Sequence, residues 1–252
     1  MRKTLFSGIA ACLLATAATA AEQSPSVIWT VGQADRSASE FALAPDRFRD
    51  FLANDFGYED KYFLVGHSVP AADFPYVLPG PADTWGGTWP TSGWRTHQVN
   101  ILFGLKEIPS DGTCTLVVDL LDYAKNFLPL VKVSVNTQDA KFQLDAPGLS
   151  VADQRKPNQM EKIVDTLSIT GNLAKATPRR LEIPIRPGVL KAGGNEVTIT
   201  VLEGSWILFD RVSLEGPAGT NVEQPQQLFI RNIEAAPYEL ADGKRRVQPL
   251  LV

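Results

Sequence analysis

Cysteine, histidine and methionine are scarce in this chain of 252 residues, which holds two of each. Cys12 lies in an apolar N-terminal run, so Cys114 alone remains in the body of the chain and no internal disulfide is expected. Nothing near Cys114 in the sequence would lower the pKa of its thiol, so a buried structural thiol is expected rather than a nucleophile. The two histidines, His67 and His97, have no recognised zinc spacing, which argues against a histidine-based metal cluster.

Long hydrophobic runs are also missing after the N-terminus. Residues 1–20 have a basic start at Arg2 and Lys3, an apolar stretch and a small-residue cleavage site that ends at Ala20, which predicts a signal peptide cleaved near Ala20. A lipobox-like reading around Cys12 is disfavoured because the apolar run continues past it. No later run approaches the roughly 20 apolar residues of a membrane span. We therefore expect a secreted or periplasmic protein with no membrane span.

A surplus of positive charge is absent as well. The chain has 24 basic and 28 acidic residues, a formal net charge of −4, and its short basic run at 244–246 does not outweigh that balance. Nucleic acid is therefore not expected as a partner, and broad binding of polyanions is disfavoured. A local cationic pocket remains compatible with this composition.

Short strands divided by turn signals make up most of the chain. In the closing stretch, Val197, Ile199 and Val201 alternate with threonines after a Gly-Gly-Asn turn, the pattern of a strand with one buried face. These patterns predict an all-β sandwich with long loops and at most short helices, one of them opening at Pro45. The expected strands cover 27–31, 62–65, 98–103, 113–121, 130–135, 141–144, 167–170, 181–185 and two closing strands within 196–214.

The predicted organisation is a signal peptide at 1–20, a sandwich domain at 21–216 and a linker with a C-terminal tail or edge strand at 217–252. Residues 66–97 are rich in proline and glycine and are expected to form a long irregular loop. Loops of this length in a compact domain are usually functional or poorly ordered.

Three stretches carry a resemblance to a known family. They are YFLVGHSVPAADFPYVLPGPADTW at 62–85, the pair NILFGLKEI and CTLVVDLLD within 100–122, and GGNEVTITVLEGSWILFDRVSLE at 193–215. On these residues, 62–216 resembles the carbohydrate-binding-like third domain of rhamnogalacturonan lyases, a galactose-binding-like jelly roll. In such lyases the catalytic Lys and His belong to a separate, preceding domain, for which this chain has no room. The resemblance therefore implies the non-catalytic part of such an enzyme.

The aromatic residues of the long loop are the first candidates for binding a sugar. Trp85, Trp89 and Trp94 fall within ten residues of each other, and Tyr76 lies just upstream. Sugar rings present C–H faces that stack on aromatic rings, so exposed indoles on a loop are suited to a pyranose. The alternative is that these rings pin the loop against the sandwich.

Polar residues around these aromatics complete the predicted site. Asp73 and Asp83 are expected either to bond sugar hydroxyls or to cap turns. Arg95 would pair with a uronic-acid carboxylate or form a plain surface ion pair, and His97 would contribute a polar contact or sit at a strand edge. No catalytic residue is assigned, because pairs of acids such as Asp119 with Asp122 carry little weight among 28 acidic residues.

These observations predict a secreted, non-catalytic carbohydrate-binding module that acts in the degradation of pectic, rhamnogalacturonan-type polysaccharide. Its partner would be a poly- or oligosaccharide. One rival is a polysaccharide lyase or glycoside hydrolase subunit with its site in the 66–97 loop. The other is a structural domain that docks on a separately encoded carbohydrate-active enzyme. No cofactor is expected; a structural calcium stays open, as does whether Asp210 is met by a backbone amide, an arginine or a metal.

Overall fold

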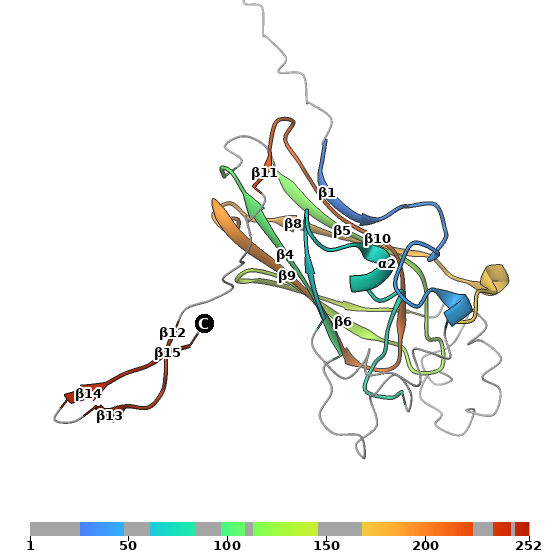
Figure 1. Cartoon of the computed structure of the whole chain (residues 1–252). Coiled ribbons are helices and arrows are strands. Elements are labelled where there is room, and N and C mark those ends of the chain that lie inside the picture. Colours follow the sequence, from blue (N-terminus) through green and yellow to red (C-terminus); the bar gives the residue numbers. More distant parts are fainter. Residues whose placement is uncertain are drawn as a thin grey trace, which may run out of the picture.

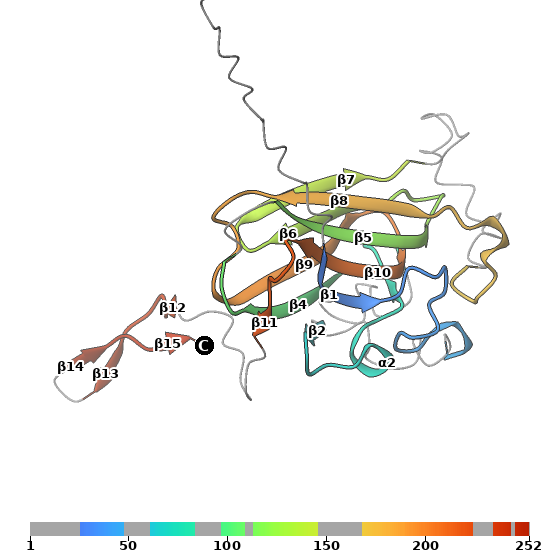
Figure 2. The same ribbon diagram turned by 90° about the horizontal axis from the view of Figure 1, so that it is seen from above.

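The computed structural model describes residues 26–47, 61–83, 97–108, 113–145, 168–223, 234–242 and 245–251. These residues form two sheets that pack face to face around one hydrophobic core (Figures 1 and 2). The expected all-β sandwich is confirmed.

The first sheet has five strands in the order β1, β10, β5 and β8, with β3 as a further partner of β10. Every pairing in this sheet is antiparallel. The strands are β1 (Ser26–Gly32), β3 (Val77–Leu78), β5 (Cys114–Tyr123), β8 (Arg179–Ile185) and β10 (Ile207–Gly216).

The second sheet has six strands in the order β11, β4, β9, β6 and β7, with β2 as a further partner of β4. The β2–β4 pairing is parallel and the others are antiparallel. The strands are β2 (Lys61–Leu64), β4 (Gln98–Leu105), β6 (Leu130–Val135), β7 (Gln138–Gln143), β9 (Gly193–Glu203) and β11 (Val222–Glu223).

The alternation read from the sequence points the apolar side chains inwards. Val197, Ile199 and Val201 on β9 are all buried, as the strand pattern predicted. Cys114 is buried too, and burial raises the pKa of its thiol, so the expected structural role is supported. Phe74 lies at the centre of an aromatic group in the same core and contacts the rings of Phe41, Phe63 and Phe209.

Two elements lie within the stretch that was expected to be irregular. Helix α2 (Pro70–Asp73) begins with its proline at the first helical turn, where the missing N–H is not needed. Strand β3 follows and pairs with the start of β10, Leu78 opposite Ile207. This stretch is therefore only partly a loop. The expected helix at Pro45 is a 3₁₀ turn, η1 (Pro45–Arg47).

One predicted strand is wrong. Residues 168–170 form a turn rather than a strand, and the short 3₁₀ segment η7 (Leu173–Lys175) follows it. Gly171 has a φ of +97°, a conformation that breaks a strand, and Ser168 O accepts a hydrogen bond from the Gly171 N–H at 3.0 Å. The β-branched residues of this stretch therefore close a turn.

The C-terminal stretch adds one strand to the sandwich and then pairs with itself. Strand β11 comes from the predicted linker and extends the edge of β4. Further on, β12 (Glu234–Ala235) pairs with β15 (Leu250–Leu251), and β13 (Leu240–Asp242) with β14 (Arg245–Val247). Figures 1 and 2 show these four short strands, in red, beside the sandwich rather than within its sheets. Residues 228–233 of the expected tail strand lie outside the described residues.

Candidate functional site

Three loops meet at the end of the sandwich where β9 leads into β10. The Ala82 N–H donates to Gly204 O at 2.9 Å, and the Ser205 N–H donates to Phe127 O at 2.9 Å. The tight turn between the two closing strands is therefore bonded on one side to the stretch that follows β3 and on the other to the loop after β5. Residues 84–96, called segment 84–96 below, belong to the predicted loop 66–97 and contain the candidate residues Trp85, Trp89, Trp94 and Arg95. They follow directly after this junction in the sequence.

Asp83 holds the junction together. Its side chain is buried, with one carboxylate oxygen accepting from the Gly80 N–H at 2.7 Å and the other accepting from the Ser205 hydroxyl. Of the two roles left open for Asp83, capping a turn is the one its contacts fit. Asp73 has a similar role, because its carboxylate accepts from the Val69 N–H at 2.7 Å at the start of α2.

Tyr76 lies in the core, not on the surface. Its side chain is 0% exposed, its hydroxyl donates to Ile169 O at 3.1 Å, and burial raises the pKa of its phenol. A ring with no exposed face has no room to stack on a sugar, so the stacking role expected for Tyr76 does not fit this placement. The residue instead holds the turn at 168–170 in place.

His97 stands at the other end of segment 84–96, next to β4. Burial lowers the pKa of its imidazole, and a hydrogen bond to the backbone of Pro79 opposes that effect only in part. Its Nδ1 atom is buried and has no hydrogen-bond partner among the described residues. The bond to Pro79 connects His97 to the same stretch as Asp83, so both flanks of segment 84–96 are fixed at one place in the sandwich. Trp85, Trp89, Trp94 and Arg95 lie outside the described residues.

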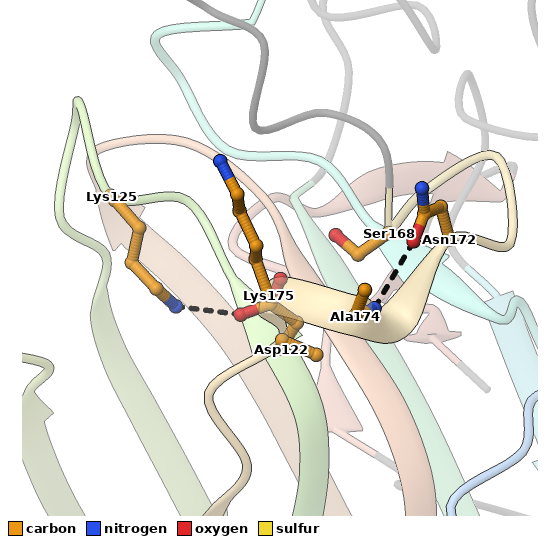
Figure 3. A pocket seen from close by; sticks show the side chains of 7 residues that line it. Asp122, Lys125, Ser168, Asn172, Ala174 and Lys175 are labelled. Atoms are coloured by element: carbon orange, nitrogen blue, oxygen red, sulfur yellow. Dashed lines mark hydrogen bonds and ion pairs between the residues drawn. The ribbon is translucent and has the colours of Figure 1, made fainter.

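A pocket opens beside this junction, between the loop after β5 and the stretch from 168 to 177 (Figure 3). Its volume is about 90 Å³. It is lined by Asp122, Lys125, Ser168, Asn172, Ala174, Lys175 and Ala176.

Asp122 and Lys125 form an ion pair in the wall of the pocket. Lys125 Nζ lies 2.6 Å from Asp122 Oδ1, donates to Tyr123 O at 2.8 Å and stands 3.4 Å above the centre of the Tyr123 ring. Asp122 Oδ1 also accepts from the Thr177 N–H at 3.0 Å. These bonds join the two sides of the pocket and compensate both charges.

The opposite wall of the pocket has polar side chains that do not take part in the Asp122–Lys125 ion pair. Ser168 is 3% exposed, and its hydroxyl has no hydrogen-bond partner in the described part of the chain. Lys175 is exposed, and within the described residues its ammonium forms no ion pair. Asn172 accepts from the Ala174 N–H at 3.1 Å and so caps η7. None of these pocket residues was predicted from the sequence, which has no local motif around them.

Asp119, which was also considered for catalysis, is held in ion pairs. Asp119 lies 2.9 Å from Arg211 Nη2 and 3.5 Å from Arg180 Nη1 on the outer face of the first sheet. Glu215 completes this group at 3.6 Å from Arg211. Among the residues that the structure describes, no group of three or more His, Cys, Asp or Glu side chains is placed to hold a metal ion.

Asp210 is met by a backbone amide, one of the three partners left open for it. The Arg36 N–H donates to Asp210 Oδ1 at 3.1 Å. Burial nevertheless raises the pKa of Asp210 from its ordinary 3.8 to about 6, and the nearby Asp35, Asp119 and Glu40 act in the same direction.

The raised pKa of Asp210 predicts a pH-dependent stability. Between pH 3.8 and about 6 the folded chain binds more protons at Asp210 than the unfolded chain, so this contribution to stability is fully present below pH 3.8 and is lost as the pH rises through about 6. Asp210→Asn should remove that slope and stabilise the protein at pH 8 by on the order of 1 kcal/mol. Urea unfolding at several pH values measures the effect, with the exposed Asp46→Asn as a control. An unchanged slope in Asp210→Asn would contradict it.

None of the helices in the described part of the chain is both long and apolar enough to cross a membrane.

Comparison with known proteins gives a match to a family model and matches to solved structures. The family model described as CBM-like, polysaccharide lyase family 4, domain III, matches residues 27–214. A structure of BtGH115A, a family GH115 4-O-methyl-alpha-glucuronidase with specificity for decorated arabinogalactans, is 17% identical with a TM-score of 0.28. That match covers 46% of this chain and 13% of the length of BtGH115A. No curated protein matches.

Proposed function

Because this chain belongs to the CBM-like family of polysaccharide lyase family 4, domain III, we propose that it binds carbohydrate without catalysis of its own. The ligand class is a pectic, rhamnogalacturonan-type polysaccharide, and the protein serves as an accessory to the enzymes that degrade it. It acts outside the cytoplasm, after cleavage of residues 1–20. The family match over 27–214 is the observation that carries this proposal.

The anchored flanks of segment 84–96 support a binding surface at this end of the sandwich. Asp83 on one side is bonded to Gly80 and Ser205, and His97 on the other is bonded to Pro79. A segment fixed at both ends loses less conformational entropy when it binds a ligand than one that hangs free. We assign stacking on sugar rings to the three tryptophans of this segment and pairing with a uronate carboxylate to Arg95.

The side chains available for acid–base chemistry within the described residues favour a binding role over a catalytic one. Asp119 is held by Arg211 and Arg180, and Asp122 by Lys125. His97 bonds the backbone of Pro79, and no carboxylate among the described residues is bonded to its imidazole to orient it. A general acid or base needs a reacting proton within hydrogen-bond reach.

Affinity gel electrophoresis on rhamnogalacturonan tests this function. The wild-type protein should be retarded, and a variant with Trp85, Trp89 and Trp94 all replaced by alanine should bind about tenfold more weakly or worse. Tyr238→Ala is the matched control, since it removes an exposed aromatic ring from the C-terminal strands and should leave binding unchanged.

Two results would contradict the proposal. If a correctly folded protein is not retarded by any pectic polysaccharide, the proposal that it binds carbohydrate of this class is wrong. Steady release of unsaturated uronides from rhamnogalacturonan, abolished in His97→Ala, would replace binding with lyase catalysis.

A further inference from the structure

The pocket beside β5 has an unbalanced charge. Asp122 and Lys125 compensate each other at 2.6 Å, which leaves the ammonium of Lys175 as the remaining charge among the described residues that line the pocket. Figure 3 shows the side chain of Lys175 extending away from Asp122, whereas that of Lys125 turns towards it. The protein as a whole is acidic, with a formal net charge of −4, so this local positive charge runs against the composition. An anionic group is the ligand that such a pocket favours.

A buried hydroxyl in the same pocket also lacks a partner. Ser168 is 3% exposed, and its Oγ has no hydrogen bond to any residue that the structure describes. A buried polar group without a partner is unfavourable, and the few that occur in folded proteins call for an explanation such as a bound ligand or water. A ligand oxygen placed between Lys175 and Ser168 would satisfy both residues.

The walls of the pocket are fixed before any ligand arrives. Tyr76 bonds the carbonyl of Ile169, next to Ser168, at 3.1 Å, and Asp122 bonds the N–H of Thr177 at 3.0 Å. The side chain of Asn172 caps the turn that carries Lys175. A site built from fixed groups loses little conformational entropy on binding.

The size of the pocket restricts the ligand to a small group. Its volume of about 90 Å³ exceeds what a single water requires. A carboxylate with a neighbouring hydroxyl fits such a space, and the rest of a sugar ring would remain at the mouth.

We propose that this pocket binds the carboxylate of a uronic acid residue, with Lys175 pairing with the carboxylate and Ser168 donating a hydrogen bond to it. The inference rests on the carbohydrate-binding function proposed above and gives it a second contact, distinct from segment 84–96. It implies that the polysaccharide is acidic.

Isothermal titration with tetragalacturonate, and with the same oligosaccharide fully methyl-esterified, tests the site. The acid should bind, and the ester should bind about tenfold more weakly because it carries no charge. Lys175→Glu should weaken binding of the acid by about tenfold and leave binding of the ester nearly unchanged, and Ser168→Ala should weaken binding of the acid severalfold. Amide resonances of residues 168 and 174–176 should shift when the acid is added.

Lys191→Glu is the matched control, because Lys191 is also an exposed lysine but follows the end of β8 that pairs with the start of β5, away from the pocket. It should bind the acid like the wild type. Equal binding of acid and ester, or an unchanged affinity in Lys175→Glu, would overturn the uronate site while leaving retardation on rhamnogalacturonan intact. If rhamnogalacturonan does not retard the wild type, the proposed carbohydrate-binding function is wrong. Whether the pocket binds a uronate is then decided separately, by the presence or absence of the amide shifts with tetragalacturonate.

Discussion

Replacing Phe74 with alanine should lower the free energy of unfolding by about 3–5 kcal/mol, because the change deletes a fully buried ring and leaves a cavity. The Phe74 side chain is 0% exposed. Its ring centre lies 5.1 Å from that of Phe209 on β10, 5.5 Å from Phe41 and 5.8 Å from Phe63 on β2. One side chain thus connects both sheets and the stretch that covers them, so the surrounding structure has little freedom to close the cavity.

Phe142→Ala is the matched control for this prediction. Phe142 lies on the edge strand β7 and is only partly buried against the core. Replacing it with alanine therefore loses less buried apolar surface and leaves an open groove in place of a cavity. Urea unfolding followed by tryptophan fluorescence compares the two variants. Since domains of this size are stable by about 5–15 kcal/mol, the Phe74 variant should be close to unfolding at 37 °C. Equal losses for the two variants would contradict the central position assigned to Phe74.

The same residue illustrates what the sequence allowed and what it did not. Alternating Val and Ile identified β9 because strand periodicity is local, and Val197, Ile199 and Val201 needed no knowledge of their partners. Tyr76 and Phe74 stand among prolines and glycines without a period. Phe74 packs against Phe209 and the hydroxyl of Tyr76 bonds Ile169, both far along the sequence, so Tyr76 was assigned to a surface it does not reach.

The pocket could not be predicted for a related reason. Asp122 lies at the end of β5 and Lys125 in the loop that follows it, whereas Ser168 and Lys175 come more than 40 residues later, and only the sandwich brings them to one end. Single lysines and serines carry no spacing signal such as metal ligands have. The turn at 168–170 was also taken for a strand, because its β-branched residues favour extended structure and Gly171 alone indicates otherwise.

The role of Asp83 lay between these cases. The sequence limited it to two functions, and the choice between them depended on Ser205, a residue 122 positions away. The residues next to Asp83 in the sequence indicated a turn, but they gave no sign of the distant partner that bonds the buried carboxylate. Sequence reasoning therefore limited the role of Asp83 to two possibilities but did not identify the contact that decides between them.

Gly204→Ala should destabilise the protein by about 3 kcal/mol or more and weaken carbohydrate binding as well, whereas Gly188→Ala should cost only about 1 kcal/mol. Both glycines have a φ of +80°, so the conformational strain of an alanine is the same at each. They differ in surroundings: a Cβ at Gly188 meets nothing within 4 Å, but one at Gly204 would fall 2.3 Å from the backbone oxygen of Leu128. The difference between the two variants therefore isolates the steric overlap.

The steric overlap of an alanine Cβ at position 204 with Leu128 should affect the binding site, because it displaces the loop after β5. Moving Leu128 disturbs the bond from Ser205 to Phe127, and Ser205 in turn holds Asp83, at the start of segment 84–96. The same loop carries Lys125 in the pocket wall. Gly204→Ala should accordingly bind rhamnogalacturonan more weakly even at temperatures where it stays folded, and Gly188→Ala should bind like the wild type. Thermal unfolding and affinity electrophoresis on the two variants provide the comparison. A Gly204 variant that is destabilised yet binds normally would show that the junction does not support the binding site. Equal stability of the two variants would show that the loop after β5 can move away from the added Cβ at no cost in free energy.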